Sequence, residues 1–189
     1  MEGAVRRSLE LARETPGAFL PRQFENPANP GVHYRVTAEE ILHTVGGLGI
    51  ERIDALVAGV GTGGTVSGVG RRLKEAFPGC RVFAVEPEAS ATISRGERGP
   101  SKIQGLAAGF VPQNYDAAIV DEVRTVSDLL AFQTKRLLGR REGVLAGVSS
   151  GANVAVALDV ARELGPQATV VTFLCDTGER YFSLDEYFA

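Results

Sequence analysis

Two glycine-rich loops carry the residues of this sequence that are best suited to chemistry. The first, Gly59-Val60-Gly61-Thr62-Gly63-Gly64, satisfies the pattern G-x-G-x-x-G and is followed by Thr65. It joins a predicted strand to a predicted helix, where backbone N–H groups bind anions. Glu86 ends the next predicted strand about 20 residues later, as in a dinucleotide-binding fingerprint. The threonine hydroxyls suit one compact phosphate equally well, and no lysine follows the last glycine as in a P-loop. Both ligands, and a plain strand–helix turn, stay open.

The second loop, Gly147-Val148-Ser149-Ser150-Gly151, satisfies G-x-S-x-G between a predicted strand and a predicted helix. A nucleophile elbow has this form, with an acid and a histidine later in the chain. The two histidines of the sequence, His33 and His43, both precede the serine. A serine without a neighbouring base is a weak nucleophile, so the loop does not predict a hydrolase. We interpret both histidines as solvated or structural.

Composition excludes several other classes of function. The 189 residues carry a net charge of −3 and no basic run, which argues against nucleic-acid binding. No apolar run approaches the roughly 20 residues that span a bilayer. The first residues are charged rather than signal-like, so we expect a cytoplasmic protein. Cys80 and Cys175 lie far apart and outside any metal-binding pattern, so we expect two unpaired thiols and no metal site.

Strands and helices alternate along most of the chain. Helices are predicted over residues 3–14, from Thr37 to about 45, from the glycine loop to about 77, from Ser127 to about 140, and over 152–164. Strands are predicted over 55–60, 81–86, 119–126, 144–148 and 168–174. The stretch Asn26-Pro27-Ala28-Asn29-Pro30 is predicted to be extended or a turn. This alternation indicates a mostly parallel sheet covered by helices on both faces, with ligands at the carboxyl ends of its strands.

Five segments taken together resemble one enzyme family. They are Gln23–Pro30 (QFENPANP), Gly61–Thr65 (GTGGT), Lys102–Phe110 (KIQGLAAGF), Gly147–Ala152 (GVSSGA) and Asp176–Tyr181 (DTGERY). Their order and spacing are similar to the pyridoxal-phosphate (PLP) enzymes of the cysteine synthase group, the O-acetylserine sulfhydrylases, whose relatives include cystathionine β-synthase. The resemblance implies an α/β fold: a three-layer parallel-sheet domain of the tryptophan synthase β-like type, truncated at its N-terminal side.

The resemblance also implies roles for individual residues. Gly61, Thr62, Gly63, Gly64 and Thr65 would bind the single phosphate of PLP. Ser149 would face the pyridine nitrogen, and a serine hydroxyl can hydrogen-bond a neutral pyridine without holding it protonated. Gln23 would help to bind the substrate carboxylate, and Phe24 would line the site. The segment from Gly105 through Ala107 to Ala108 would line the substrate pocket, unless it is a surface loop. Family members also bind a serine acetyltransferase tail at this site.

The lysines depart from the family pattern. The family holds PLP through a lysine near the start of the chain, and it grips the substrate carboxylate with a Ser-Gly-Asn-Thr-type loop. Neither feature is expected here, since Lys74, Lys102 and Lys135 all lie in other contexts. The chain therefore resembles the last three-fifths of such an enzyme: residues 1–27 from the smaller domain and 28–189 from the larger, cofactor-binding domain.

This match leads to several expectations. We expect a chain of this length to be poorly stable unless it pairs with a complementary fragment or forms a homodimer, because sheet edges and apolar faces would otherwise be exposed. The expected activity of the whole protein is cysteine synthase, which converts O-acetylserine and sulfide to cysteine and acetate. Alternatives are cystathionine β-synthase, a serine or threonine dehydratase, an NAD(P)-binding Rossmann module that uses Glu86, and a non-catalytic truncated paralogue.

Overall fold

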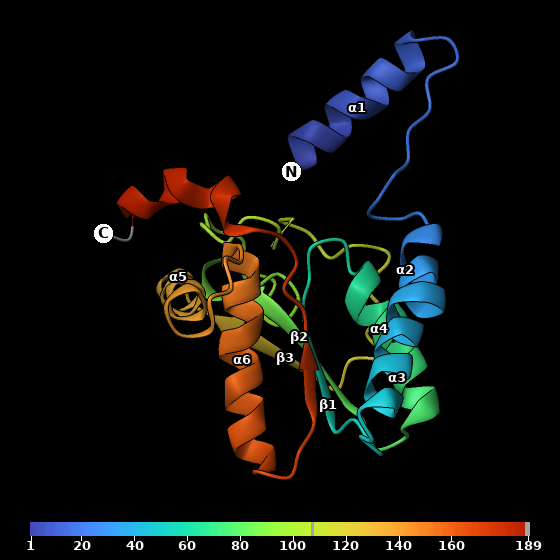
Figure 1. Cartoon of the computed structure of the whole chain (residues 1–189). Helices are drawn as coiled ribbons and strands as arrows, with labels where there is room; N and C mark the ends of the chain where they lie inside the picture. The colour runs from blue at the N-terminus through green and yellow to red at the C-terminus, as the bar shows by residue number, and fades with distance from the viewer. Residues whose placement is uncertain (107, 188–189) are drawn as a thin grey trace.

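The computed structural model describes residues 1–106 and 108–187 of the chain. Its centre is a parallel sheet with strand order β3-β2-β1-β4. The strands are β1 (Ala55–Gly59), β2 (Arg81–Pro87), β3 (Glu122–Val126) and β4 (Val170–Thr172). Helices α5 and α6 cover one face of this sheet, and α2, α3 and α4 lie on the other side (Figure 1). The predicted three-layer α/β architecture is confirmed.

The helices lie close to their predicted places. They are α1 (Glu2–Glu14), α2 (Ala28–Val32), α3 (Ala38–Gly47), α4 (Gly64–Ala76), α5 (Asp128–Leu137) and α6 (Val148–Leu164). Two π-helical stretches, η1 (His33–Thr37) and η3 (Leu138–Glu142), and two 3₁₀ segments, η2 (Glu88–Ser90) and η4 (Gly178–Tyr187), complete them. Helix α1 has no buried residue and stands apart from the sheet (Figure 1). Within the described part of the chain, every helix is too short or too polar to cross a membrane.

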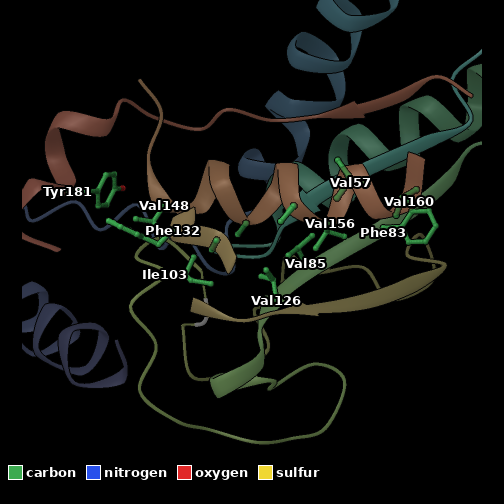
Figure 2. Packing of buried hydrophobic residues seen from close by; sticks show 14 of the residues in the cluster. Val57, Phe83, Val85, Ile103, Val126, Phe132, Val148, Val156, Val160 and Tyr181 are labelled. Carbon is green, nitrogen blue, oxygen red and sulfur yellow. The ribbon is translucent and has the colours of Figure 1, made fainter. Parts of the chain in front are cut away.

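Residues 55–58 of β1 and 82–85 of β2 are all apolar because both faces of these two strands are buried. In β1, Ala55 and Val57 belong to the cluster beneath α5 and α6, whereas Leu56 and Ala58 belong to the cluster beneath α3 and α4. Strand β2 alternates in the same way. Figure 2 shows the first cluster, where Phe83 packs among side chains from β1, β2 and α6. Side chains alternate between the faces of a strand, so a continuous apolar run is typical of a sheet with helices on both sides.

Two predicted strands differ from the structure. Residues 144–148 form no strand; Ala146 makes one antiparallel bridge with Thr177, and Val148 already belongs to α6. Ala146 and Val148 are nevertheless buried, and Val148 packs in the same cluster as Phe132 and Ile103. The strand predicted over 119–126 begins only at Glu122. Ile119 is held instead in a turn by its N–H bond to the carbonyl oxygen of Asp116 at 3.1 Å.

The Asn-Pro stretch is predicted to be extended or a turn, but only Asn26 and Pro27 lie outside a helix, and Ala28 to Pro30 are helical. Pro30 lies in the first turn of α2, where a backbone N–H has no intrahelical acceptor and a proline loses no hydrogen bond. The chain then stays helical through η1 and α3. Thr37 is consequently no N-cap: its φ and ψ are −59° and −42°, and its hydroxyl pairs with His33. The predicted helix start at Thr37 is wrong because the helical run starts at Ala28.

Candidate functional site

The first glycine loop lies at the switch point of the sheet. The chain passes from β1 to β2 to β3 on one side, and β4 is added on the other side of β1. Open parallel sheets bind ligands where this direction changes, outside the carboxyl ends of the strands. Residues 61–65 directly follow β1 and lead into α4, and residues 173–178 follow β4. We call residues 61–65 the cup.

Several backbone N–H groups at the cup have no acceptor among the described residues, although the N–H of Gly64 lies 3.4 Å from Thr62 Oγ1. No acceptor among the described residues meets the N–H groups of Gly63, Thr65 or Val66, although Gly63 and Val66 are buried. Gly63 has φ +81°, and a Cβ there would lie 2.7 Å from the backbone nitrogen of Tyr115. Unpaired donors at the N-terminus of a 13-residue helix fit an anion. The cup therefore meets the requirement for a phosphate-binding loop.

The threonine hydroxyls of the cup are held by residues from α2 and η1. Thr62 Oγ1 accepts from Asn29 Nδ2 at 2.9 Å, which leaves the hydroxyl proton of Thr62 to donate elsewhere. Thr65 Oγ1 lies 3.3 Å from His33 Nε2. The other ring nitrogen of His33, Nδ1, lies 3.1 Å from Thr37 Oγ1. The sequence did not predict Asn29 and His33 as neighbours of the cup, because the Asn-Pro stretch was expected to be extended or a turn and His33 to be solvated or structural.

Ser149 lies across Gly105 from the cup. A Cβ on Gly61 would overlap the carbonyl oxygen of Gly105, and a Cβ on Gly105 would lie 3.9 Å from Ser149 Oγ. Ser149 is 4% exposed and is the second residue of α6. The positive end of the helix dipole disfavours a protonated pyridine beside this hydroxyl. The site thus offers anion donors at the cup and a neutral hydroxyl for a ring nitrogen.

The loop after β4 fixes the position of Ser149. The N–H of Gly147 donates to the carbonyl oxygen of Asp176 at 2.9 Å, and Ser150 Oγ accepts from the N–H of Cys175 at 2.9 Å. Tyr181 donates its hydroxyl to the Asp176 carboxylate. Burial raises the pKa of the Cys175 thiol, and a hydrogen bond with Ser149 partly offsets this. Both cysteines are free, as predicted.

Gln23 and Phe24 are tied to the cup through their backbone. The carbonyl oxygen of Gln23 accepts from Asn29 Nδ2 and from Asn114 Nδ2, each at 2.8 Å. The rings of Phe24 and Phe110 meet edge to face, with centroids 5.0 Å apart. Gln23 and Phe24 also line a cavity of about 490 Å³ beside α1. Asn29 therefore links the predicted substrate segment to Thr62.

The segment between residues 105 and 108 is only partly placed with the site. Gly105 separates Gly61 from Ser149, as described above. Ala108 is half-buried, and the contacts among the described residues do not tie it to the cup or to Ser149. Ala107 lies outside the described residues.

Glu86 is not available as the ribose-binding acid of a dinucleotide site. Its side chain is 1% exposed at the end of β2. The carboxylate accepts from the N–H of Ile93 at 2.8 Å and from the N–H and hydroxyl of Ser94 at 2.9 and 2.5 Å. Its hydrogen bonds hold the loop after β2, which removes the main support for a dinucleotide ligand.

Lys74 on α4 and Lys135 on α5 contact other side chains. Lys74 Nζ donates to Asp121 at 2.8 Å. Lys135 is 7% exposed, and its ammonium group lies 5.2 Å from the centroid of the Phe132 ring and 6.0 Å from that of Tyr181. These contacts anchor Lys74 and Lys135 to the surroundings of α4 and α5.

Comparison with known proteins gives the family. The model of the family described as pyridoxal-phosphate dependent enzyme matches residues 1–176. A cysteine synthase of Staphylococcus aureus is 48% identical over 187 residues, which are 99% of this chain and 59% of the relative. The structure of an O-ureido-L-serine synthase superimposes with a TM-score of 0.88 at 46% identity, covering 96% of this chain and 56% of that one. The structure of an O-acetylserine dependent cystathionine β-synthase from Helicobacter pylori superimposes with a TM-score of 0.90 at 39% identity, covering 96% of this chain and 58% of that one.

The match extends over nearly all of this chain, whereas the chain spans only 59% of the length of the curated relatives it matches. The unpaired donors of the cup and the position of Ser149 fit the phosphate and pyridine ring of PLP. By its sequence match over residues 1–176 and its fold, this chain belongs to the pyridoxal-phosphate-dependent enzyme family.

Proposed function

We propose that this chain is the PLP-phosphate-binding part of a cysteine synthase, which replaces the acetoxy group of O-acetylserine with sulfide to give cysteine and acetate. The observation that carries the proposal is the convergence of the cup and Ser149 on opposite sides of Gly105. The cysteine synthase relative at 48% identity supports this choice of reaction. When bound, PLP supplies an electron sink for the α-carbon of an amino acid.

In this proposal, residues of the chain orient the cofactor and its substrate. The N–H groups of Gly61–Val66 and the hydroxyls of Thr62 and Thr65 hold the phosphate. The hydroxyl of Ser149 donates to the ring nitrogen and leaves it unprotonated. Gln23 binds the substrate carboxylate, and Phe24, Gly105 and Ala108 line the pocket.

We propose further that the lysine that holds PLP comes from outside residues 1–189, because Lys74, Lys102 and Lys135 all lie outside the family's lysine context and Lys74 and Lys135 contact other side chains. Residues 1–27 then belong to the smaller domain and 28–189 to the larger one. The whole protein would act on a small amino acid as a cytoplasmic homodimer. We also propose a serine acetyltransferase tail as a second ligand of the same site.

Ligand binding to the 189-residue chain tests the phosphate site. Isothermal titration with PLP should show binding that inorganic phosphate competes for, and pyridoxal, which lacks the phosphate, should bind at least tenfold more weakly, about 1.4 kcal/mol. Thr62→Val and Thr65→Val should weaken PLP binding. Thr44→Val is a matched control, since Thr44 lies exposed on α3 and its hydroxyl donates to the carbonyl oxygen of Glu40. Equal affinity for pyridoxal and PLP, or tight binding of NAD⁺ alone, would overturn the proposal.

Cystathionine formation is a second candidate reaction, because the Helicobacter pylori cystathionine β-synthase superimposes with a TM-score of 0.90. The whole protein should be given O-acetylserine with either sulfide or homocysteine, and the amino-acid products should be separated by chromatography. Cysteine as the faster product supports the synthase. Faster formation of cystathionine would reassign the nucleophile and leave the phosphate site as proposed.

A further inference from the structure

His33 connects the cup to a second hydroxyl outside it. The imidazole is half-buried on η1, with Nδ1 3.1 Å from Thr37 Oγ1 and Nε2 3.3 Å from Thr65 Oγ1. A Cβ on Gly68 of α4 would lie 2.9 Å from His33 Cβ, so the residue packs closely between η1 and α4. The ring therefore sits in a fixed place, one hydrogen bond behind a cup hydroxyl.

A neutral imidazole can fill this place in two ways. If Nδ1 carries the proton, Nε2 accepts from Thr65, and a lone pair of Thr65 faces the cup. If Nε2 carries the proton, Nε2–H donates to Thr65, Nδ1 accepts from Thr37, and the hydroxyl proton of Thr65 is free to donate into the cup. An anion in the cup attracts the second arrangement and repels the first.

We propose that His33 is a positioning residue whose protonation is coupled to occupancy of the cup by an anion. An anion selects the form with Nε2 protonated, either the neutral tautomer or the imidazolium, and this form aims the Thr65 hydroxyl at the anion. The inference rests on the proposed phosphate site and adds a pH-dependent control of its affinity.

The surroundings of His33 leave the anion as the main charge that can act on it. Burial lowers the pKa of His33, which favours the neutral ring near neutral pH in the absence of a ligand. Charged neighbours on η1, α3 and α4 are paired with one another or lie elsewhere; they are Tyr34 with Glu75, Arg72 with Glu39, Arg71 with Asp116, Lys74 with Asp121, Arg35 against Gly31, and the exposed Glu40. A dianion in the cup should raise the pKa of His33.

NMR of the 189-residue chain labelled with ¹⁵N tests the coupling directly. The sequence has two histidines, and His43 is exposed on α3, so it serves as the internal reference. The probe is inorganic sulfate, a dianion that does not titrate between about pH 5 and pH 8. Sulfate should shift the His33 nitrogens to the form with Nε2 protonated and raise the pKa of His33 by about one unit, and PLP should displace it. The nitrogens of His43 should not respond.

Linkage gives a second, independent readout. A rise of about one unit in the His33 pKa requires sulfate to bind about tenfold more tightly below that range than above it. His33→Gln keeps an amide donor that cannot titrate, so it should bind sulfate with a pH-independent Kd. His43→Gln should keep the pH dependence of the unsubstituted chain.

The outcomes separate the two proposals. If neither sulfate nor PLP binds, the proposed phosphate site fails. If both bind but the pKa and tautomer of His33 stay unchanged, or if His33→Gln keeps the full pH dependence, the coupling is refuted and the phosphate site stands. The NMR measurement uses the unsubstituted chain, so a folding defect in either variant does not affect it.

Discussion

Replacing Gly63 with alanine separates backbone strain from contact at the cup. Gly63 has φ +81°, and an added Cβ would lie 2.7 Å from the nitrogen and 2.8 Å from the Cα of Tyr115. These are backbone atoms, and the N–H of Tyr115 is itself held by the carbonyl oxygen of Pro112 at 3.1 Å. The loop cannot move aside without breaking its own turn.

The expected cost of Gly63→Ala follows from three contributions. A left-handed conformation costs an alanine about 1–2 kcal/mol. The overlap with Tyr115 adds about 1–3 kcal/mol, as in overpacked cores. The stiffer unfolded chain returns about 0.4–1 kcal/mol. The free energy of unfolding should therefore fall by roughly 1–5 kcal/mol.

Urea denaturation of the 189-residue chain, followed by circular dichroism, measures this change. Gly143→Ala is the matched control, because Gly143 has φ +69° and nothing within 4 Å of an added Cβ. The free energy of unfolding of Gly143→Ala should fall only by the contribution of backbone strain. Gly3→Ala in α1, with neither strain nor contact, should stabilise the chain or leave it unchanged. Equal losses for Gly63→Ala and Gly143→Ala would refute the contact with Tyr115.

Three further predictions concern the core, an ion pair and a thiol. Phe83→Ala should lower the unfolding free energy by about 3–5 kcal/mol in urea, because Phe83 is fully buried. Asp121→Asn should make the free energy of unfolding less sensitive to acid. Burial raises the pKa of the Asp121 carboxylate, but hydrogen bonds from Lys74 and a backbone N–H outweigh burial and hold this pKa low. The stability that the carboxylate contributes is therefore present above about pH 4 and is lost as the pH falls through the lowered pKa. In a Cys175→Ser chain, iodoacetamide should label Cys80 at pH 8 only after unfolding, because burial raises the thiol pKa to about 11; rapid labelling of the folded chain would contradict this.

The sheet could be predicted because its central strands are covered by helices on both faces. Residues 55–58 are buried whichever face they point to, so an unbroken apolar run identifies a central strand. The same rule misleads at residues 144–148, where Ala146 and Val148 are buried although the segment forms no strand; Val148 packs into the core as the first residue of α6. Burial without a strand partner looks the same in sequence.

The cup could be predicted, but its supporting residues could not. A strand, a glycine loop and a helix are local, and the pattern reveals them. Asn29 and His33 reach Thr62 and Thr65 across 33 and 32 positions, and their place depends on α2 and η1 being helical. The helical conformation of residues 28–37 was not predicted, because a residue before proline usually avoids the helical region. That preference does not exclude a proline in the first turn of a helix. The signal that could have predicted these contacts is the set of polar side chains that residues 28–37 present when the segment is interpreted as a helix.

The identity of the ligand is decided around the cup rather than within it. The glycine pattern fits a dinucleotide and a single phosphate alike, since both use donors at a helix N-terminus. Glu86 breaks the tie: with three hydrogen bonds to residues 93 and 94 and 1% exposure, it cannot bind a ribose without unfolding the loop after β2. Gly105 also favours a single phosphate, because its carbonyl oxygen packs against Gly61 and Ser149 lies on its other side, across from the cup. A short ligand with a phosphate at one end and a ring nitrogen at the other matches this spacing of donors, and a second nucleotide would find no partner in Glu86.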